Sequence, residues 1–128
     1  MAVFMGLPWV DVPWRKHLHF LDSRQTQSEA RQFVRRGALL GRGHPCTLAY
    51  CIGNEVPPDV VRWHGARRVE RFLAELADVA RQADPDGQVT YASFPPTEYL
   101  DLSPLDFVTF NVYLHEYRQP AEKRRRSA

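Results

Sequence analysis

Asn54 and Glu55 place an amide and a carboxylate side by side, directly after a strand-like apolar run over 47–53 and shortly before Pro57 and Pro58. A buried strand that ends on two polar side chains places them where the edge of a sheet meets solvent or a ligand. Such positions often belong to functional sites, because a rigid element holds the residues while the following loop leaves them accessible. Asn54 and Glu55 are therefore the first candidates for a functional site.

A second group of polar side chains follows from the alternation in residues 106–114. Asn111 and Tyr113 alternate there with apolar residues, so one face of the strand is apolar and the other becomes polar. In a barrel, the apolar face would contact the surrounding helices and the polar face would point into the lumen. Asn111 and Tyr113 are then expected at the carboxyl-end mouth, which Glu55 also reaches. The apolar set is Val108, Phe110, Val112 and Leu114, and the small residues expected on the same side as Glu55 are Ala49, Cys51 and Gly53.

The elements that must position these residues alternate between strands and helices. Apolar runs bounded by glycine or proline predict strands, and apolar residues spaced three and four apart predict helices. Because this alternation uses tight loops, we expect right-handed crossovers and a parallel sheet in an α/β fold. In chain order the sequence predicts a strand over 3–9, a loop over 10–24, a helix over 28–40, a strand over 47–52, a helix around 69–80, a strand over 88–94, a helical turn within 95–100 and a strand over 106–114.

The composition indicates one soluble globular unit, with 128 residues, 44% hydrophobic and 25% charged. The sequence has no apolar stretch of the roughly 18 residues that suggest a membrane span. Its first residues also lack the basic start and long apolar run of a signal peptide. We therefore expect a cytoplasmic protein with no membrane partner.

The formal net charge of +2 is small, and its excess gathers in the segment 122–128. Four consecutive basic residues near a terminus could contact nucleic acid or an acidic membrane surface, but a disordered basic tail over 118–128 is the preferred interpretation. Upstream of this tail the sequence has no basic helix with interleaved aromatics and no zinc-finger spacing. No nucleic-acid partner is therefore expected.

The spacing of cysteine and histidine does not favour a metal or a cofactor. Cys46 and Cys51 are the only cysteines and lack CxxC spacing, so two reduced, buried thiols are expected. Of the five histidines only His17 and His19 are close in sequence, and no acidic partner repeats near them. The absence of a GxGxxG or P-loop motif argues against a dinucleotide or ATP site, so we expect no cofactor.

Four segments together resemble consecutive strands of an enzyme barrel. Residues 6–9 (GLPW), 51–55 (CIGNE) and 106–113 (DFVTFNVY) resemble strands three, four and six of the (β/α)8 barrel of family 2 glycoside hydrolases and their retaining relatives. Residues 88–94 (QVTYASF) fall where strand five belongs. The resemblance implies a partial TIM barrel over residues 1–117, with about four parallel strands and flanking helices. It also implies a carbohydrate substrate and chemistry at a β-glycosidic bond.

The resemblance implies roles for individual residues. Glu55 matches the general acid/base, which protonates the leaving glycosidic oxygen and later deprotonates the attacking water. Asn54 matches the amide that hydrogen-bonds the sugar 2-hydroxyl. Tyr113 matches the strand-six tyrosine that orients the nucleophile. Trp9 would help to wall the sugar site, and Asn111 would belong to the same substrate-binding rim.

The sequence departs from the family pattern because it lacks the nucleophile. Retaining hydrolysis needs a second carboxylate about 5–5.5 Å from the first, and in this family it ends strand seven. The sequence has no counterpart of strands one, two, seven and eight, and a full barrel takes about 250 residues. We therefore expect a fragment of a retaining glycosidase, inactive by itself, whose open sheet edges favour self-association.

Other interpretations stand beside this one. Glu55 could cap the following segment or pair with Arg62 or Arg67, as a lone carboxylate at a strand end often does. The chain could be a non-catalytic carbohydrate-binding remnant, or an interaction module that acts only through its basic tail. Some barrels of this kind are fused to glycosyltransferase modules, which allows a role for the parent protein in polysaccharide assembly or trimming.

Overall fold

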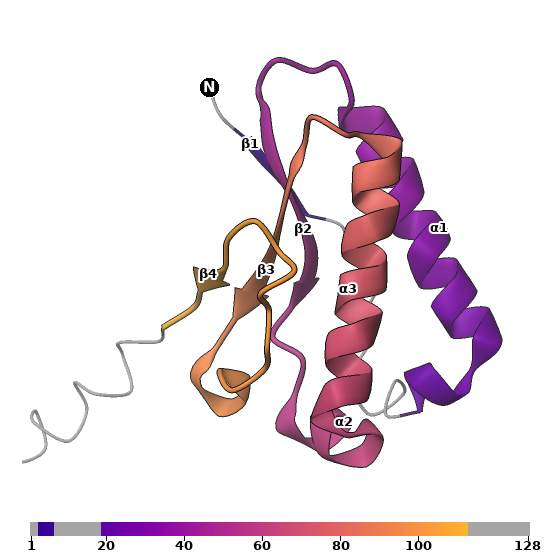
Figure 1. Ribbon diagram of the computed structural model, residues 1–128, viewed down its shortest axis with the longest axis vertical. Helices are drawn as coiled ribbons and strands as arrows, with labels where there is room; N and C mark the ends of the chain where they lie inside the picture. Colours follow the sequence, from indigo (N-terminus) through magenta and orange to yellow (C-terminus); the bar gives the residue numbers. More distant parts are fainter. Residues whose placement is uncertain (1–2, 7–18, 113–128) are drawn as a thin grey trace, which may run out of the picture.

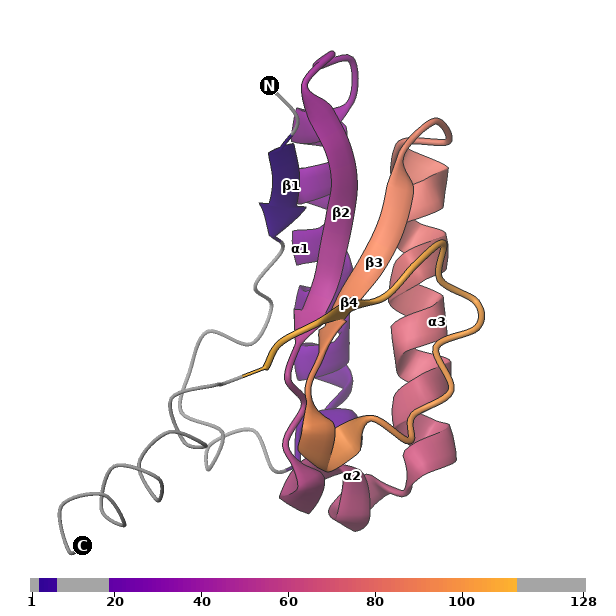
Figure 2. The ribbon, with the colours of Figure 1, turned by 90° about the vertical axis from the view of Figure 1, so that its left-hand side faces the viewer.

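The computed structural model describes residues 3–6, of which only the backbone is considered, and residues 19–112. Four strands pair in the order β1-β2-β3-β4, and each neighbouring pair is parallel. Helices α1 and α3 cover one face of this sheet, as Figure 1 and the rotated view in Figure 2 show. The elements are β1 (Val3–Gly6), η2 (Phe20–Asp22), α1 (Arg24–Gly41), β2 (Thr47–Asn54), α2 (Pro58–His64), α3 (Ala66–Ala83), β3 (Gln88–Ser93), η3 (Pro95–Thr97) and β4 (Thr109–Phe110).

The main core lies between the sheet and the two long helices. Helix α3 presents a stripe of buried residues that recur every three to four positions, as an amphipathic helix requires. Ser23 begins helix α1, because its side-chain oxygen accepts a hydrogen bond from the Thr26 backbone N–H at 3.2 Å. The predicted α/β class and parallel sheet are confirmed. The buried stripe of α3 consists of Val69, Phe72, Leu73, Leu76, Ala77, Ala80 and Ala83.

Tyr50 connects the centre of the sheet to both helices. Its ring is fully buried, and its hydroxyl hydrogen-bonds Asp84 Oδ2 (2.5 Å) after α3 and Ala38 O (3.2 Å) in α1. Burial and the neighbouring Asp84 carboxylate raise the Tyr50 pKa well above its usual value, so the hydroxyl stays protonated. A Cβ at Gly87 would lie 2.5 Å from the Tyr50 ring, so the turn before β3 needs glycine for this close approach.

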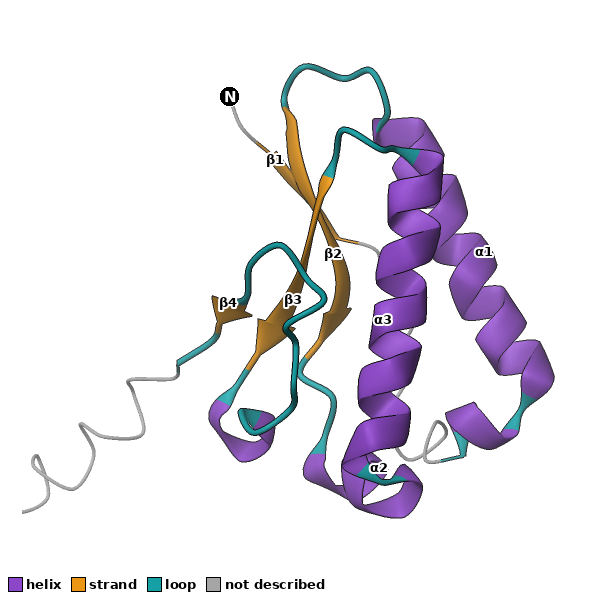
Figure 3. Cartoon of the chain, viewed as in Figure 1, coloured by secondary structure: helices purple, strands orange, loops and turns teal. Residues whose placement is uncertain are grey.

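Several elements differ from the sequence expectations. The segment 10–24 was predicted as a loop, but the structure has the 3-10 helix η2 at Phe20–Asp22, and α1 begins at Arg24 rather than at residue 28. Helix α2 was not predicted, because Pro57 and Pro58 mark the end of a strand while the seven-residue helix that begins there is too short to show a period. The last strand was predicted over 106–114, but the structure has only β4, Thr109–Phe110. Asp106 explains part of this difference: its carboxylate accepts from Val89 N (2.7 Å), and its own N–H donates to Val89 O (3.0 Å). The side chain of Asp106 thus replaces a strand partner at that point. Figure 3 draws the segment before β4 as a loop.

The two cysteines differ in their exposure. Cys46 is exposed, so the expectation of a buried thiol at this position is wrong; it lies in the turn before β2, outside the core. Cys51 is half-buried in β2, and neither cysteine forms a disulfide.

Among the helices of residues 19–112, none combines the length and apolarity needed to cross a bilayer.

Candidate functional site

Backbone hydrogen bonds extend the sheet past the ends of its strands and position Glu55 and Asn111. Glu55 N donates to Ala92 O (2.8 Å), and Asn111 N donates to Ser93 O (2.8 Å). Because β2 and β4 flank β3 on either side, these two bonds hold Glu55 and Asn111 across the carboxyl end of the same strand. Residues 56 positions apart in the sequence thereby become neighbours.

The side chain of Asn111 joins the two polar residues that follow β2. Its Nδ2 donates to Glu55 Oε1 (2.9 Å) and to Asn54 Oδ1 (3.2 Å). Asn54 is exposed, whereas Glu55 and Asn111 are half-buried. We call Asn54, Glu55 and Asn111 the strand-end cluster. It presents two amides and a carboxylate at the carboxyl ends of adjacent parallel strands, where ligands bind in many α/β proteins.

A β-bulge in β2 lies directly before this cluster. Two residues of β2, 52 and 53, lie opposite a single residue of β3. A Cβ on Gly53 would lie 3.1 Å from the Tyr91 ring and 3.5 Å from Leu73 of α3, so Gly53 faces the helix layer. Strict alternation predicted Gly53 on the same side of the sheet as Cys51. This expectation is wrong, because the bulge places an extra residue at 52–53 and so breaks the alternation after Cys51. The bulge sets the direction in which Asn54 leaves the strand.

Glu55 adopts an unusual backbone conformation. Its φ is +48°, the only positive φ of a residue other than glycine in the described part of the chain. A left-handed conformation costs such a residue about 1–3 kcal/mol and persists only where the surroundings determine it. Here both backbone polar groups of the next residue are held: Val56 N donates to the Tyr91 hydroxyl (2.9 Å), and Val56 O accepts from Thr97 Oγ1 (3.0 Å).

Tyr91 links the strand-end cluster to the core. Burial is the main cause that raises its pKa to about 12, and the charge of nearby Glu55 adds to the increase. Its hydroxyl therefore stays protonated at neutral pH while it accepts the hydrogen bond from Val56. The sequence analysis did not identify Tyr91 or Thr97 as residues that support the site, and no local pattern could have done so, because their partner lies 35 or more positions away.

Two neighbouring polar side chains complete the description of this end of the sheet. Cys51 Sγ donates to Gly53 O (3.2 Å), and burial raises the pKa of the thiol, so it is not a thiolate nucleophile at neutral pH. The hydroxyl of Thr90, which pairs with Cys51 in the sheet register, is buried and has no hydrogen-bond partner among the described residues. Within the described residues, no three His, Cys, Asp or Glu side chains are grouped closely enough to hold a metal ion.

The structure brings together three of the five predicted site residues, namely Asn54, Glu55 and Asn111. The other two, Trp9 and Tyr113, lie outside the described residues. In the last strand Thr109 pairs with Ala92, and its hydroxyl donates to Tyr91 O at 3.1 Å. The apolar set was expected to contact helices, and this is wrong for Val108, Phe110 and Val112, which are exposed in the described part of the chain. The proximity of the three residues is thus an observation, whereas their part in catalysis is a proposal.

Comparison with known proteins shows a similarity in fold alone. No family model matches the sequence, and no curated protein matches it significantly. Among solved structures, the chain is similar to a glycosyl hydrolase family 2 (GH2) member from Bacteroides cellulosilyticus DSM 14838, with 22% sequence identity and a TM-score of 0.53. The match covers 94% of this chain and 15% of that one, so the chain corresponds to a small part of the larger protein. The arrangement of strands and helices in this chain is therefore similar to that of a segment of a glycosyl hydrolase family 2 member.

Proposed function

We propose that this chain carries the acid/base side of a retaining glycoside-hydrolase site, with Glu55 as the proton donor and acceptor. The observation that supports it most is the hydrogen bond from Asn111 Nδ2 to Glu55 Oε1 (2.9 Å) at the carboxyl ends of parallel strands. The fold similarity to part of a glycosyl hydrolase family 2 member agrees with this assignment. A four-stranded parallel sheet in sequential order also suits a partial (β/α)8 barrel.

The proposed chemistry begins with a protonated Glu55. Its carboxyl group gives its proton to the glycosidic oxygen as the bond to the anomeric carbon breaks and a second carboxylate, the nucleophile, bonds to that carbon to form a glycosyl-enzyme. The resulting carboxylate then removes a proton from the water that attacks the anomeric carbon of the glycosyl-enzyme, which restores the acid. The hydrogen bond from Asn111 holds one carboxylate oxygen and so limits rotation of the Glu55 side chain.

Asn54 has a separate part in the proposal. Its Oδ1 accepts from Asn111 Nδ2 (3.2 Å), so its own NH2 group is directed as a donor. A donor next to the acid/base can hydrogen-bond the sugar 2-hydroxyl, a contact that strengthens as the ring approaches an oxocarbenium ion. Asn111 thereby orients two residues with different partners, one on the glycosidic oxygen and one on the sugar ring.

A second carboxylate is needed to complete this site. The nucleophile of a retaining mechanism lies about 5–5.5 Å from the acid/base. By the resemblance it would end a seventh strand, and the four strands formed by the described residues include no such element. We therefore propose half of a catalytic site, to which the nucleophile must be added from outside the described residues.

The test is the Glu55→Gln variant of the protein as its source cells produce it, assayed on a series of aryl β-glycosides. We expect turnover of substrates with poor leaving groups to fall by about 100-fold or more, because general acid catalysis contributes 10²–10⁴-fold. Substrates whose phenol needs no protonation should lose much less. The matched control is Glu98→Gln, because Glu98 is an exposed residue directly after η3. This variant should leave all rates unchanged. Equal rates for Glu55→Gln and wild type on every substrate would reject the assignment.

A non-catalytic carbohydrate-binding role is the second candidate, and it is favoured by the lack of a nucleophile strand among β1 to β4. This role predicts that calorimetric titration with β-linked oligosaccharides gives saturable binding without hydrolysis. It also predicts that Glu55→Gln binds these saccharides as tightly as wild type. Hydrolysis that depends on Glu55 would exclude it.

A further inference from the structure

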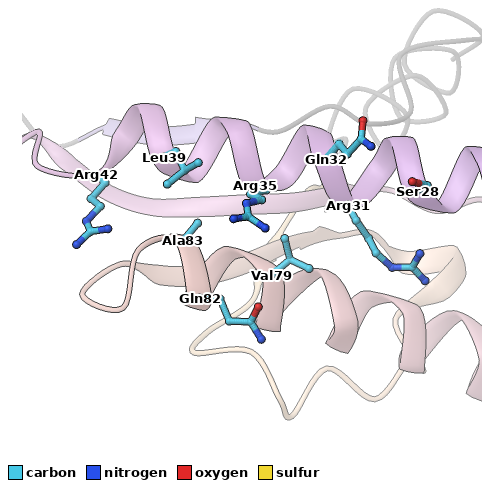
Figure 4. A pocket seen from close by; sticks show the side chains of 9 residues that line it. All are labelled: Ser28, Arg31, Gln32, Arg35, Leu39, Arg42, Val79, Gln82 and Ala83. Carbon is cyan, nitrogen blue, oxygen red and sulfur yellow. The ribbon is translucent and has the colours of Figure 1, made fainter.

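A groove of about 440 Å³ lies along the contact between α1 and α3. Its lining combines basic, apolar and amide side chains from the two helices and the residue that ends α1. Figure 4 shows Arg31, Arg35 and Arg42 extending from the α1 side toward α3, where Val79 and Gln82 lie opposite. The groove belongs to the helix layer, so it is distinct from the strand-end cluster.

The lining of this groove carries positive charge without an acidic residue of its own. At one end Arg31 is already engaged, because its guanidinium pairs with Glu75 of α3 at 3.0 Å. Arg35 and Arg42 are exposed, and within residues 19–112 neither forms an ion pair. These two guanidinium groups are therefore available to an anionic ligand, and each can form two parallel hydrogen bonds to one carboxylate.

The spacing of the lining residues fits a linear ligand. Arg31, Arg35, Leu39 and Arg42 lie four, four and three positions apart, so they form one stripe on the helix surface. At a rise of 1.5 Å per residue this stripe is about 17 Å long, which an extended peptide of about five residues spans. Between the two available arginines, Leu39 is half-exposed and faces the same groove as Val79, so the centre of the stripe is apolar.

We infer that the α1–α3 groove binds a linear acidic segment of a protein partner. Its carboxylates pair with Arg35 and Arg42, and an apolar side chain between them packs on Leu39 and Val79. Charge complementarity and the apolar centre both favour such a peptide. Single-stranded nucleic acid needs aromatic surfaces for its bases, and the lining has none; an anionic membrane needs a protruding apolar face rather than a groove.

Fluorescence anisotropy with the intact chain tests this inference. The probe is a labelled peptide of about ten residues that alternates carboxylates with two leucines, long enough to exceed the stripe. We expect saturable binding that weakens with salt, as exposed ion pairs do. The Arg35→Glu/Arg42→Glu variant should bind about tenfold or more weakly, because like charges then face each other. The matched control, Arg36→Glu/Arg62→Glu, makes the same charge change at exposed arginines outside the groove and should bind within about twofold of wild type.

Two control peptides separate the contributions to binding. Replacing the carboxylates with amides should abolish binding, and replacing only the leucines with serines should weaken it. In wild-type protein, chemical-shift changes at the Leu39 and Val79 methyl groups should accompany binding, which keeps the test valid if a variant fails to fold. Equal weakening by both double variants, binding of the amide peptide, or tighter groove-dependent binding of single-stranded DNA or anionic vesicles would overturn the inference.

Discussion

The pair β2–β3 and the strand β4 belong to one parallel sheet, yet they differ in how their side chains are covered. On the helix side of β2 and β3, Tyr50 and Val89 have no exposed surface. On β4, Phe110 follows the same alternation but is 47% exposed, and no helix among the described residues covers it. The difference shows that apolar alternation alone does not stabilise a strand here; the cover supplied by α1 and α3 does.

The largest expected effect is on the free energy of unfolding, and it compares a side chain buried in the helix layer with an exposed one. Leu76 is fully buried in α3, so Leu76→Ala should lower the free energy of unfolding by about 2–5 kcal/mol through lost burial and the cavity it leaves. Leu48→Ala is the matched control, because Leu48 lies in β2 but is 45% exposed, and it should cost less than about 1 kcal/mol. Urea denaturation followed by circular dichroism measures both.

Phe110→Ala extends this comparison to β4. We expect a cost close to that of Leu48→Ala, since the two side chains are exposed to a similar degree. A cost near that of Leu76→Ala would show that β4 is buried in solution and would contradict the contrast between the two parts of the sheet.

The second prediction concerns what covers the uncovered part. Exposed strand edges and apolar faces favour pairing with another chain, and Val108, Phe110 and Val112 all expose apolar surface around β4. We predict concentration-dependent self-association in sedimentation velocity, which Phe110→Lys should weaken or abolish. Tyr99→Lys, at a 60% exposed aromatic residue outside β4, should leave it unchanged. A monodisperse monomer at all concentrations would contradict this prediction.

The extent to which the sequence predicted the structure follows the same division. Helices α1 and α3 and strands β2 and β3 were predicted because their apolar periods report the cover that they have. The last strand was predicted too long, over 106–114 instead of Thr109–Phe110, because Asp106 takes the place of a strand partner. Helix α2 was not predicted, because it has only two buried valines. Periodicity reports burial, and it fails where burial is slight.

The candidate site divides in a similar way. Asn54 and Glu55 could be predicted because they directly follow an apolar strand, and Asn111 because polar and apolar residues alternate in residues 106–114. The bulge at 52–53, the contact of Tyr91 with Val56 and the arginine groove could not, because each depends on residues far apart in the sequence. Local patterns thus identified the residues of the strand-end cluster, whereas tertiary contacts determine the backbone that carries them.

The smallest expected effect tests whether Glu55 is held in its conformation against its intrinsic preference. Its φ of +48° is a conformation that glycine adopts at little cost. Glu55→Gly loses the hydrogen bond from Asn111 but removes the strain, so we expect the free energy of unfolding to rise by about 0.5–1 kcal/mol.

Asp59→Gly is the control for this variant, because Asp59 is an exposed residue in the first turn of α2. There glycine adds flexibility and removes a carboxylate that stabilises the helix N-terminus, so the free energy of unfolding should fall by about 0.5–1 kcal/mol or more. If Glu55→Gly destabilised the protein as much as this control, the conformation at Glu55 would carry no strain. Stabilisation by Glu55→Gly would instead mean that the chain keeps a carboxylate at the end of β2 where glycine would be more stable, as expected of a residue retained for function.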